Sequence, residues 1–154
     1  MGNANAVGVN GVMDGSEIKC FGRKIPCFLG VFKLDDLHKL NVVKNHIGFI
    51  IIHEGHAVAL YTDENYIDVF DSLGLQNKSI ISPICIFLKT HLPCKTLRVN
   101  TKIQGSGSEN CAKYALLYLR LRSRGYSFNQ ITRLFSCDSV ANDKRIRKLF
   151  NQCF

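Results

Sequence analysis

Short apolar runs dominate the first two thirds of the chain, whereas the last third carries apolar stripes at helical spacing. Residues 46–53, 57–62 and 66–70 are rich in β-branched residues and are separated by turn-forming residues, which predicts three consecutive strands. Residues 97–103 alternate between apolar and polar side chains, as a fourth strand would. A further apolar run, residues 28–32, precedes them. The pattern predicts a small, mainly antiparallel sheet.

Helical patterns surround these strands. The leucine-rich segment 34–40 predicts two helical turns, and the segment around Pro83 predicts a helix with Ser82 as N-cap and Pro83 at its first position. The strongest helical pattern covers residues 111–124 and stops at Gly125. Its apolar stripe consists of Ala112, Ala115, Leu116 and Leu119.

Two shorter helices are predicted near the end of the chain. Ser127 and Gln130 form a capping-box pattern that opens the first. Residues 140–150 form the second, with Ile146, Leu149 and Phe150 as its apolar face. Helices that pack on a small sheet define the expected fold class as α+β.

The chain of 154 residues has room for one domain. Residues 1–25 are rich in Gly and Asn without periodicity and are predicted to form a flexible arm, which leaves residues 26–154 as the domain. No apolar run approaches the ~18 residues that span a bilayer, and the start lacks the pattern of a signal peptide. We therefore expect a protein that is neither secreted nor inserted into a membrane.

The positive charge is concentrated in the last quarter of the chain. The net charge is +8, and residues 113–154 hold 9 Lys and Arg against 2 Asp, a net of +7. A one-sided basic surface favours a polyanion such as nucleic acid, although a solvated helical face has the same composition. The candidate nucleic-acid contacts are Arg120, Arg122, Arg124, Lys144, Arg145, Arg147 and Lys148.

Cys111 has a different setting from the other six cysteines. The odd count of seven and the absence of a C-x-x-C pair argue against a disulfide framework or a zinc knuckle. Most of the thiols are expected to be buried as small apolar groups. Cys111, however, follows a Gly/Ser loop and begins the strongest helix, where backbone N–H groups favour a thiolate and can hold an oxyanion.

A thiolate nucleophile needs a histidine within reach and a group that orients the imidazole. A hairpin turn centred on Asp63 and Glu64 would set His56 opposite Asp71. The pair His46 and Asp63 is an alternative, because its turn would fall on Glu54-Gly55.

The remaining histidines give weaker signals. His53-Glu-Gly-His56 is one residue short of the H-E-x-x-H zinc motif and lies in a predicted strand, so metal binding is not expected. His38 and His91 are predicted to be surface or cap residues.

Four residues, by their order and spacing along the chain, resemble the pattern of a known family. His56 opens a strand, Asp71 follows Phe70 and precedes Ser-Leu-Gly, Gln104 lies seven residues before the nucleophile, and Cys111 starts a helix. The pattern resembles the adenovirus-type cysteine endopeptidases (adenain) and, more distantly, the SUMO- and ubiquitin-like-specific proteases. The resemblance extends over about residues 28–135 and favours the His56/Asp71 pair, since only Asp71 has the following Ser-Leu-Gly.

The resemblance implies a papain-like cysteine protease domain with a central helix that carries the nucleophile. Cys111 would attack the peptide carbonyl, His56 would transfer the proton, Asp71 would orient the imidazole, and Gln104 with the Cys111 N–H would stabilise the oxyanion. Two departures are Ala57, where the family usually has Trp, and Ala112, where it usually has Gly.

The family also suggests partners and a location. The implied substrates are viral precursor proteins of the capsid or core, cut after small residues such as Gly in the virion or in the nucleus or cytoplasm of an infected cell. No cofactor is needed for the chemistry, while DNA or a viral peptide would stimulate a monomeric enzyme. Two alternatives remain open: a deubiquitinase or SUMO-type isopeptidase, and a catalytically weak virion protein that binds nucleic acid.

Overall fold

A computed structural model describes residues 13–41, 44–74, 77–105 and 107–154 of the chain. Its sheet contains five strands, in spatial order β1-β2-β3-β4-β5. The strands are β1 (Phe28–Lys33), β2 (Ile47–His53), β3 (His56–Thr62), β4 (Tyr66–Phe70) and β5 (Thr96–Val99). The three central strands confirm the predicted consecutive strands.

The sheet is mixed, which corrects the expectation of a mainly antiparallel one. The pairs β2/β3 and β3/β4 are antiparallel, but β1/β2 and β4/β5 are parallel. Parallel neighbours require a connection that crosses from one end of the sheet to the other. The 3-10 helix η1 (Leu34–Lys39) lies on the first connection and α3 (Lys78–His91) on the second.

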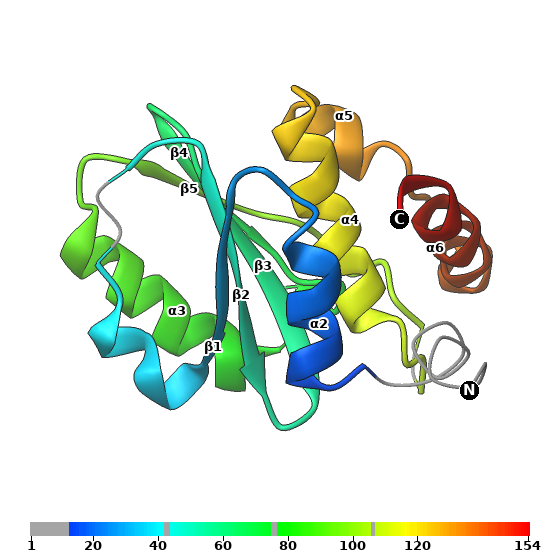
Figure 1. Cartoon of the computed structure of the whole chain (residues 1–154), viewed down its shortest axis with the longest axis horizontal. Helices are drawn as coiled ribbons and strands as arrows, with labels where there is room; N and C mark the ends of the chain where they lie inside the picture. The colour runs from blue at the N-terminus through cyan, green and yellow to red at the C-terminus, as the bar shows by residue number, and fades with distance from the viewer. Residues whose placement is uncertain (1–12, 42–43, 75–76, 106) are drawn as a thin grey trace.

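Helices cover both faces of the sheet (Figure 1). On one face, α3 and η1 pack against alternate strand residues such as Phe49 and Ile51. On the other face, α2 (Gly15–Gly22) and α4 (Cys111–Ser123) pack against the intervening residue Ile50. The strands are therefore apolar on both sides, and the alternation decides which of the two apolar clusters each side chain enters.

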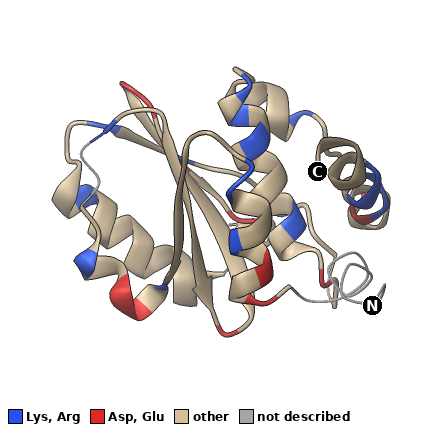
Figure 2. Cartoon of the chain, in the orientation of Figure 1, with Lys and Arg blue, Asp and Glu red and all other residues tan. Residues whose placement is uncertain are grey.

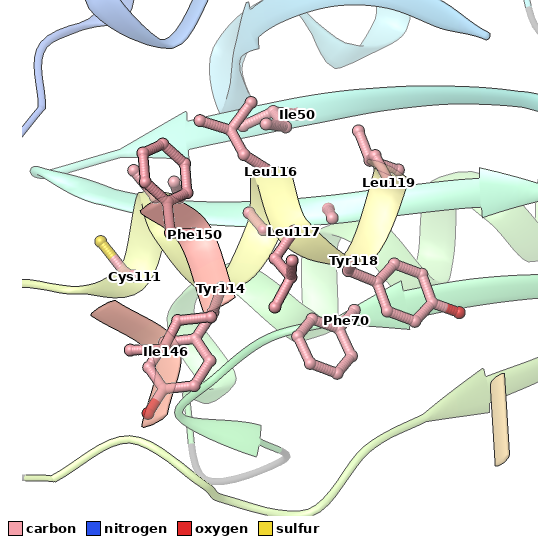
Figure 3. Packing of buried hydrophobic residues seen from close by; sticks show 14 of the residues in the cluster. Ile50, Phe70, Cys111, Tyr114, Leu116, Leu117, Tyr118, Leu119, Ile146 and Phe150 are labelled. Atoms are coloured by element: carbon pink, nitrogen blue, oxygen red, sulfur yellow. The ribbon is translucent and has the colours of Figure 1, made fainter. Parts of the chain in front are cut away.

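Helix α4 occupies the centre of one layer, between the sheet and α6 (Ser139–Cys153), as Figure 1 shows. Residues from Cys111 to Leu119 are all buried, because α5 (Phe128–Thr132) and α6 cover the side that the sheet leaves open. Figure 3 shows Phe70 of β4 beside Tyr118, and the two rings stack with centroids 4.3 Å apart. The predicted stripe is thus buried, but the buried surface extends around the whole helix.

The predicted starts of the last helices are confirmed to within one residue, whereas α6 continues to Cys153, three residues past its predicted end. Gly125, with φ of +93°, follows the end of α4, where only a residue without a Cβ adopts this conformation easily. Ser127 and Gln130 form the predicted capping box at α5. Asp138 caps α6 by accepting hydrogen bonds from the N–H groups of Val140 and Ala141.

Helix α2 overturns part of the prediction for the first 25 residues. Asp14 and Glu17 form a capping box at its start, and Ile18 is buried against the core. The predicted flexible arm therefore does not extend through residues 15–22; residues 1–12 lie outside the described part of the chain. The Gly- and Asn-rich composition of the first residues did not reveal this helix, whose sequence signals are the acidic cap and Ile18.

The predicted start of the helix around Pro83 was wrong by several residues. Helix α3 begins at Lys78 after Asn77, so Ser82 is not its N-cap and Pro83 lies inside it. Ile80 and Ile81 occupy the additional N-terminal turn and are buried in the core. Their burial favours the longer helix despite the backbone hydrogen bond that a proline cannot donate.

Candidate active site

His56 begins β3, directly after the tight turn that joins β2 to β3. Glu54 and Gly55 both have positive φ, +49° and +77°, and Gly55 tolerates this conformation without strain. The turn pairs His53 with His56 across the hairpin. This places the imidazole of His56 at the end of the sheet.

Asp71 lies directly after β4, and its carboxylate oxygen Oδ1 is 2.6 Å from Nε2 of His56. The predicted pair is therefore formed, but not by the predicted register. The β3–β4 turn is centred one position later than expected, so strand pairing ends at Ala59 and Phe70 and would next set Asp71 opposite Val58. A turn over Asp71–Gly74 redirects the chain there, with the Gly74 N–H donating to the Asp71 carbonyl at 2.8 Å.

The carboxylate of Asp71 is fully buried and held from several directions. It accepts hydrogen bonds from the Leu73 N–H at 2.9 Å and from the side-chain amide of Asn77 at 3.2 Å. The side chain of Asn100 bonds both the N–H and the carbonyl of Asp71, at 2.8 and 2.6 Å. These contacts fix the acid in one orientation toward His56.

Cys111 is the first residue of α4 and lies on the other side of His56. Its Sγ is 3.8 Å from the carbonyl oxygen of Gly55, the residue before His56. Figure 3 shows Cys111 at the N-terminal end of α4, at the margin of the packed cluster. A carboxylate only accepts hydrogen bonds, so Nε2 of His56 carries the proton toward Asp71 and Nδ1 remains for the thiol.

The electrostatics of the site favour a charged imidazole. Burial by itself lowers the pKa of His56, but hydrogen bonds and charge from Asp71 and Cys111 outweigh it and raise the pKa from 6.5 to about 9. His56 is then an imidazolium at neutral pH. A cation beside a cysteine at a helix N-terminus stabilises the thiolate, the form that acts as a nucleophile.

A cavity of about 250 Å³ contains both His56 and Cys111. Ala57 and Ala112, the two departures from the family pattern, also line it and are themselves buried. Met13, just before α2, and Ile18, within α2, line the cavity as well. Cys111 therefore faces a cavity that is lined in part by helix α2, which the composition of the sequence did not reveal.

Gln104 is buried on the chain segment between β5 and α4. Its Nε2 donates to the carbonyl oxygen of Ser108 at 2.6 Å, and its Oε1 accepts from the hydroxyl of Ser72. The main chain of Gln104 also bonds to the carbonyl of Ser72, at 2.9 Å. These bonds tie Gln104 to the residue after Asp71.

The alternative pair of His46 and Asp63 is not formed. The β2–β3 register would set the two residues opposite each other, as expected, but the ring of His46 bonds Glu64 at 2.6 Å and the hydroxyl of Tyr61 at 3.2 Å. The carboxylate of Asp63 instead accepts from Arg122 at 3.0 Å.

The other histidines have separate roles. His53 lies 3.7 Å from Glu54, and among the described residues no group of three or more metal-ligating side chains comes together. His91 bonds the carbonyl of Phe87 near the C-terminus of α3, as a capping residue does. His38 lies in the last turn of η1 and is exposed.

Two of the predicted nucleic-acid contacts are structural. Arg122 lies over the ring of Tyr61 and forms ion pairs with Asp63 and the fully buried Asp68, at 3.0 and 3.2 Å. Arg120 donates to the carbonyls of Cys153 and Lys24. Both side chains make these contacts because they lie on the central helix α4 rather than on a surface helix.

The other basic candidates are exposed. In α6 these are Lys144, Arg145, Arg147 and Lys148, and Arg124 lies at the end of α4. Figure 2 shows the α6 cations at the edge of the molecule, in the helix that α4 separates from the sheet. Arg145 also donates to the carbonyl of Leu134.

Comparison with known proteins supports the fold class without adding a function. No protein-family model and no curated protein sequence matches this chain. Among solved structures, the central domain of an uncharacterized protein from Legionella pneumophila (Lpg1148) is similar, with a TM-score of 0.53 at 11% identity. The match covers 92% of this chain and 99% of that domain. At this identity the likeness concerns the fold alone, an α+β arrangement of a five-stranded mixed sheet and helices.

Sequence reasoning missed several residues that shape the site. Asn77 and Asn100 hold Asp71, and Ser72 bonds Gln104, yet none of them belongs to a recognisable motif. The Asp14-x-x-Glu17 capping box was a usable signal for α2 and hence for one wall of the cavity.

No helix within the described residues is long and apolar enough to cross a membrane.

Proposed function

We propose that this protein is a cysteine endopeptidase of papain-like arrangement, related in design to the adenovirus-type enzymes. One observation carries the proposal: a buried Asp71 holds His56 at 2.6 Å, in the same cavity as the first residue of α4, Cys111. Nucleophile, base and orienting acid are the three parts that thiol-dependent acyl transfer requires. The order of His56, Asp71, Gln104 and Cys111 along the chain resembles that family. This resemblance supports the same assignment without relying on the measured distance between His56 and Asp71.

In the first half of the reaction, Cys111 becomes acylated. Its thiolate Sγ attacks the substrate carbonyl carbon, while the thiol proton resides on Nδ1 of His56. The oxyanion accepts hydrogen bonds from the Cys111 N–H and from Gln104. As the carbonyl re-forms, the C–N bond breaks and the His56 imidazolium protonates the leaving amine, which leaves a thioester on Cys111.

In the second half, water hydrolyses the thioester. His56, now neutral, takes a proton from the water that attacks the thioester carbonyl. The C–S bond then breaks, the carboxylic acid leaves, and the sulfur departs as a thiolate while His56 keeps the proton, which restores the starting ion pair. Asp71 stays ionised throughout and keeps Nε2 protonated, so that Nδ1 is always the atom that exchanges protons with substrate and thiol.

The substrate class follows from the resemblance and from the shape of the cavity. We expect precursor polypeptides cut after a small residue such as Gly, because the carbonyl must reach the sulfur of a cysteine that is only 7% exposed. Ala57 replaces the large aromatic side chain that the family usually has beside the histidine. Its small size leaves space above the imidazole for a substrate group.

Selective alkylation tests whether Cys111 is activated. Iodoacetamide reacts with the thiolate, and at pH 6.5 only about 1% of an ordinary thiol is ionised. Limiting iodoacetamide followed by peptide mapping should modify Cys111 at least ~10-fold faster than the exposed Cys20, Cys94 and Cys137. His56→Ala should remove this advantage, and the matched variant His46→Ala, whose ring bonds Glu64, should keep it.

Cleavage assays then test the endopeptidase itself. Cys111→Ala and His56→Ala should each abolish hydrolysis of Gly-containing precursor peptides, while His46→Ala retains most of the activity. Full hydrolysis without Cys111 would contradict the proposal. Fluorogenic ubiquitin and SUMO substrates distinguish the isopeptidase alternative, since an endopeptidase for viral precursors should leave them intact.

A second candidate function, nucleic-acid binding, is favoured by the exposed cations of α6. It is compatible with the protease, because α4 lies between α6 and the sheet that carries His56 (Figure 1). Measuring peptide hydrolysis with and without duplex DNA at low salt tests for stimulation. A binding constant that falls steeply as salt rises would indicate phosphate contacts.

A further inference from the structure

The amide of Gln104 has only one orientation that satisfies its surroundings. The carbonyl oxygen of Ser108 can only accept a hydrogen bond, so the atom 2.6 Å from it must be the nitrogen Nε2. The oxygen Oε1 therefore faces the hydroxyl of Ser72, which donates to it. Rotating the amide by 180° would bring two carbonyl oxygens together at Ser108, whereas the Ser72 hydroxyl can pair with either end of the amide, so the Ser108 carbonyl sets the orientation.

Ser72 is built into the structure rather than exposed beside it. The residue is 1% exposed, and its carbonyl accepts the N–H groups of Ile103 and Gln104, both at 2.9 Å. Directly before it, Asp71 is bonded through main-chain atoms to the side chain of Asn100. The segment that carries the acid is thus joined along its length to the segment that carries the amide.

The side-chain amide of Gln104 has a second N–H group that can take part in the proposed reaction. Its amide nitrogen has two N–H groups, and the Ser108 carbonyl takes one of them. In the proposed mechanism the second N–H group donates to the oxyanion, which requires the amide to stay in place. The Ser72 hydroxyl holds the opposite end of the amide and thereby restricts its movement.

We propose that Ser72 is a positioning residue that holds the Gln104 amide in place for oxyanion stabilisation and links it to Asp71. The inference rests on the proposed function, since it matters only if Cys111 forms a tetrahedral intermediate. Ser72 touches neither substrate nor reacting atoms and acts entirely through Gln104. Removing an oxyanion donor typically costs about 10²–10³-fold in rate, so a variant that only loosens the donor should lose less.

Two reactions of Cys111 separate positioning from general damage. Acylation by the p-nitrophenyl ester of an N-acylglycine passes through an oxyanion, whereas alkylation by iodoacetamide does not. Ser72→Ala should slow the acylation step about 10-fold, mainly in kcat rather than KM, and leave the alkylation rate of Cys111 within 2-fold of wild type. Ser72→Thr, which keeps the hydroxyl, should restore acylation at least in part.

A double-mutant cycle tests whether Ser72 acts through the amide. In a Gln104→Ala background, adding Ser72→Ala should change the acylation rate by less than 2-fold. Ser123→Ala is the matched control, because it removes a serine hydroxyl that bonds the Arg120 carbonyl at the far end of α4 and should leave both reactions unchanged.

The outcomes separate the two proposals. Three results would overturn the positioning role of Ser72. Ser72→Ala could acylate like wild type, or it could lose alkylation and acylation equally. The substitution could also add its full effect to that of Gln104→Ala. A wild-type protein that neither acylates nor shows a fast-reacting Cys111 would instead overturn the proposed function.

Discussion

His56 connects the stability of the fold to pH. Its pKa in the folded protein is about 9, against 6.5 for the ordinary side chain, because Asp71 and Cys111 outweigh the cost of burial. The folded state therefore binds the proton more tightly than the unfolded state. The resulting stabilisation is fully present below pH 6.5 and is lost as the pH rises through 9.

The size of this effect follows from the same two values. Each tenfold difference in proton affinity is worth about 1.4 kcal/mol, so the shift from 6.5 to about 9 corresponds to about 3 kcal/mol. The side chain of His56 is 14% exposed, so solvent screens its ion pair with Asp71 only weakly. A loss of 3 kcal/mol is a large fraction of the stability of a small domain.

The assay compares the wild-type protein with His56→Gln, whose amide can still donate to Asp71 but does not titrate. Urea unfolding under reducing conditions gives the free energy of unfolding of both proteins at intervals from pH 5.5 to 9.5. The difference in the free energy of unfolding between wild type and His56→Gln should shrink by about 3 kcal/mol across this range, mostly between pH 6.5 and 9. In a Cys111→Ser background the change should be smaller but still present, because Asp71 remains.

A difference between wild type and His56→Gln that stays constant with pH would refute the reasoning. So would a difference that grows toward alkaline pH, which would mean that the folded protein holds His56 neutral. Either result would also remove the imidazolium from the proposed mechanism, since a neutral His56 cannot stabilise a thiolate by charge.

Four further outcomes are expected. Asp71→Asn should lower the pKa of His56 toward 6.5 in an NMR titration and reduce peptide hydrolysis at least ~10-fold; an unchanged titration would contradict the role of the acid. Asp68→Ala should destabilise the fold by ~3–5 kcal/mol in urea unfolding, because two arginines lose their buried partner; a loss below 1 kcal/mol would argue against that network. Leu116→Ala, in the centre of the core, should cost ~2–5 kcal/mol by the same measurement, and a neutral effect would mean that α4 is not packed as described. If α6 contacts DNA, Lys148→Glu should make the binding constant less dependent on salt without altering peptide hydrolysis; an unchanged salt slope would exclude this side chain from the contact.

The repeating patterns of the sequence already determined much of the secondary structure. The β-branched runs of the three central strands and the stripe of α4 depend on neighbours along the chain, so local periodicity is sufficient to find them. The capping box at Ser127 and the stop at Gly125 are equally local. The candidate residues His56, Asp71, Gln104 and Cys111 were likewise identifiable, because the chemistry limits which residue types can serve and the family pattern sets their order.

The tertiary structure alone decided how distant segments meet. The edge strand β1 pairs in parallel with β2, and β5 with β4. Both pairings depend on where the connecting segments cross the sheet, and no local pattern encodes that path. Asp71 reaches His56 through a turn after β4 rather than through strand register. Arg122 became a structural cation because α4 is central, where a buried charge needs Asp68 as its partner. Such contacts arise from packing between residues far apart in sequence, so only the folded chain brings a thiol, an imidazole and a carboxylate into one site.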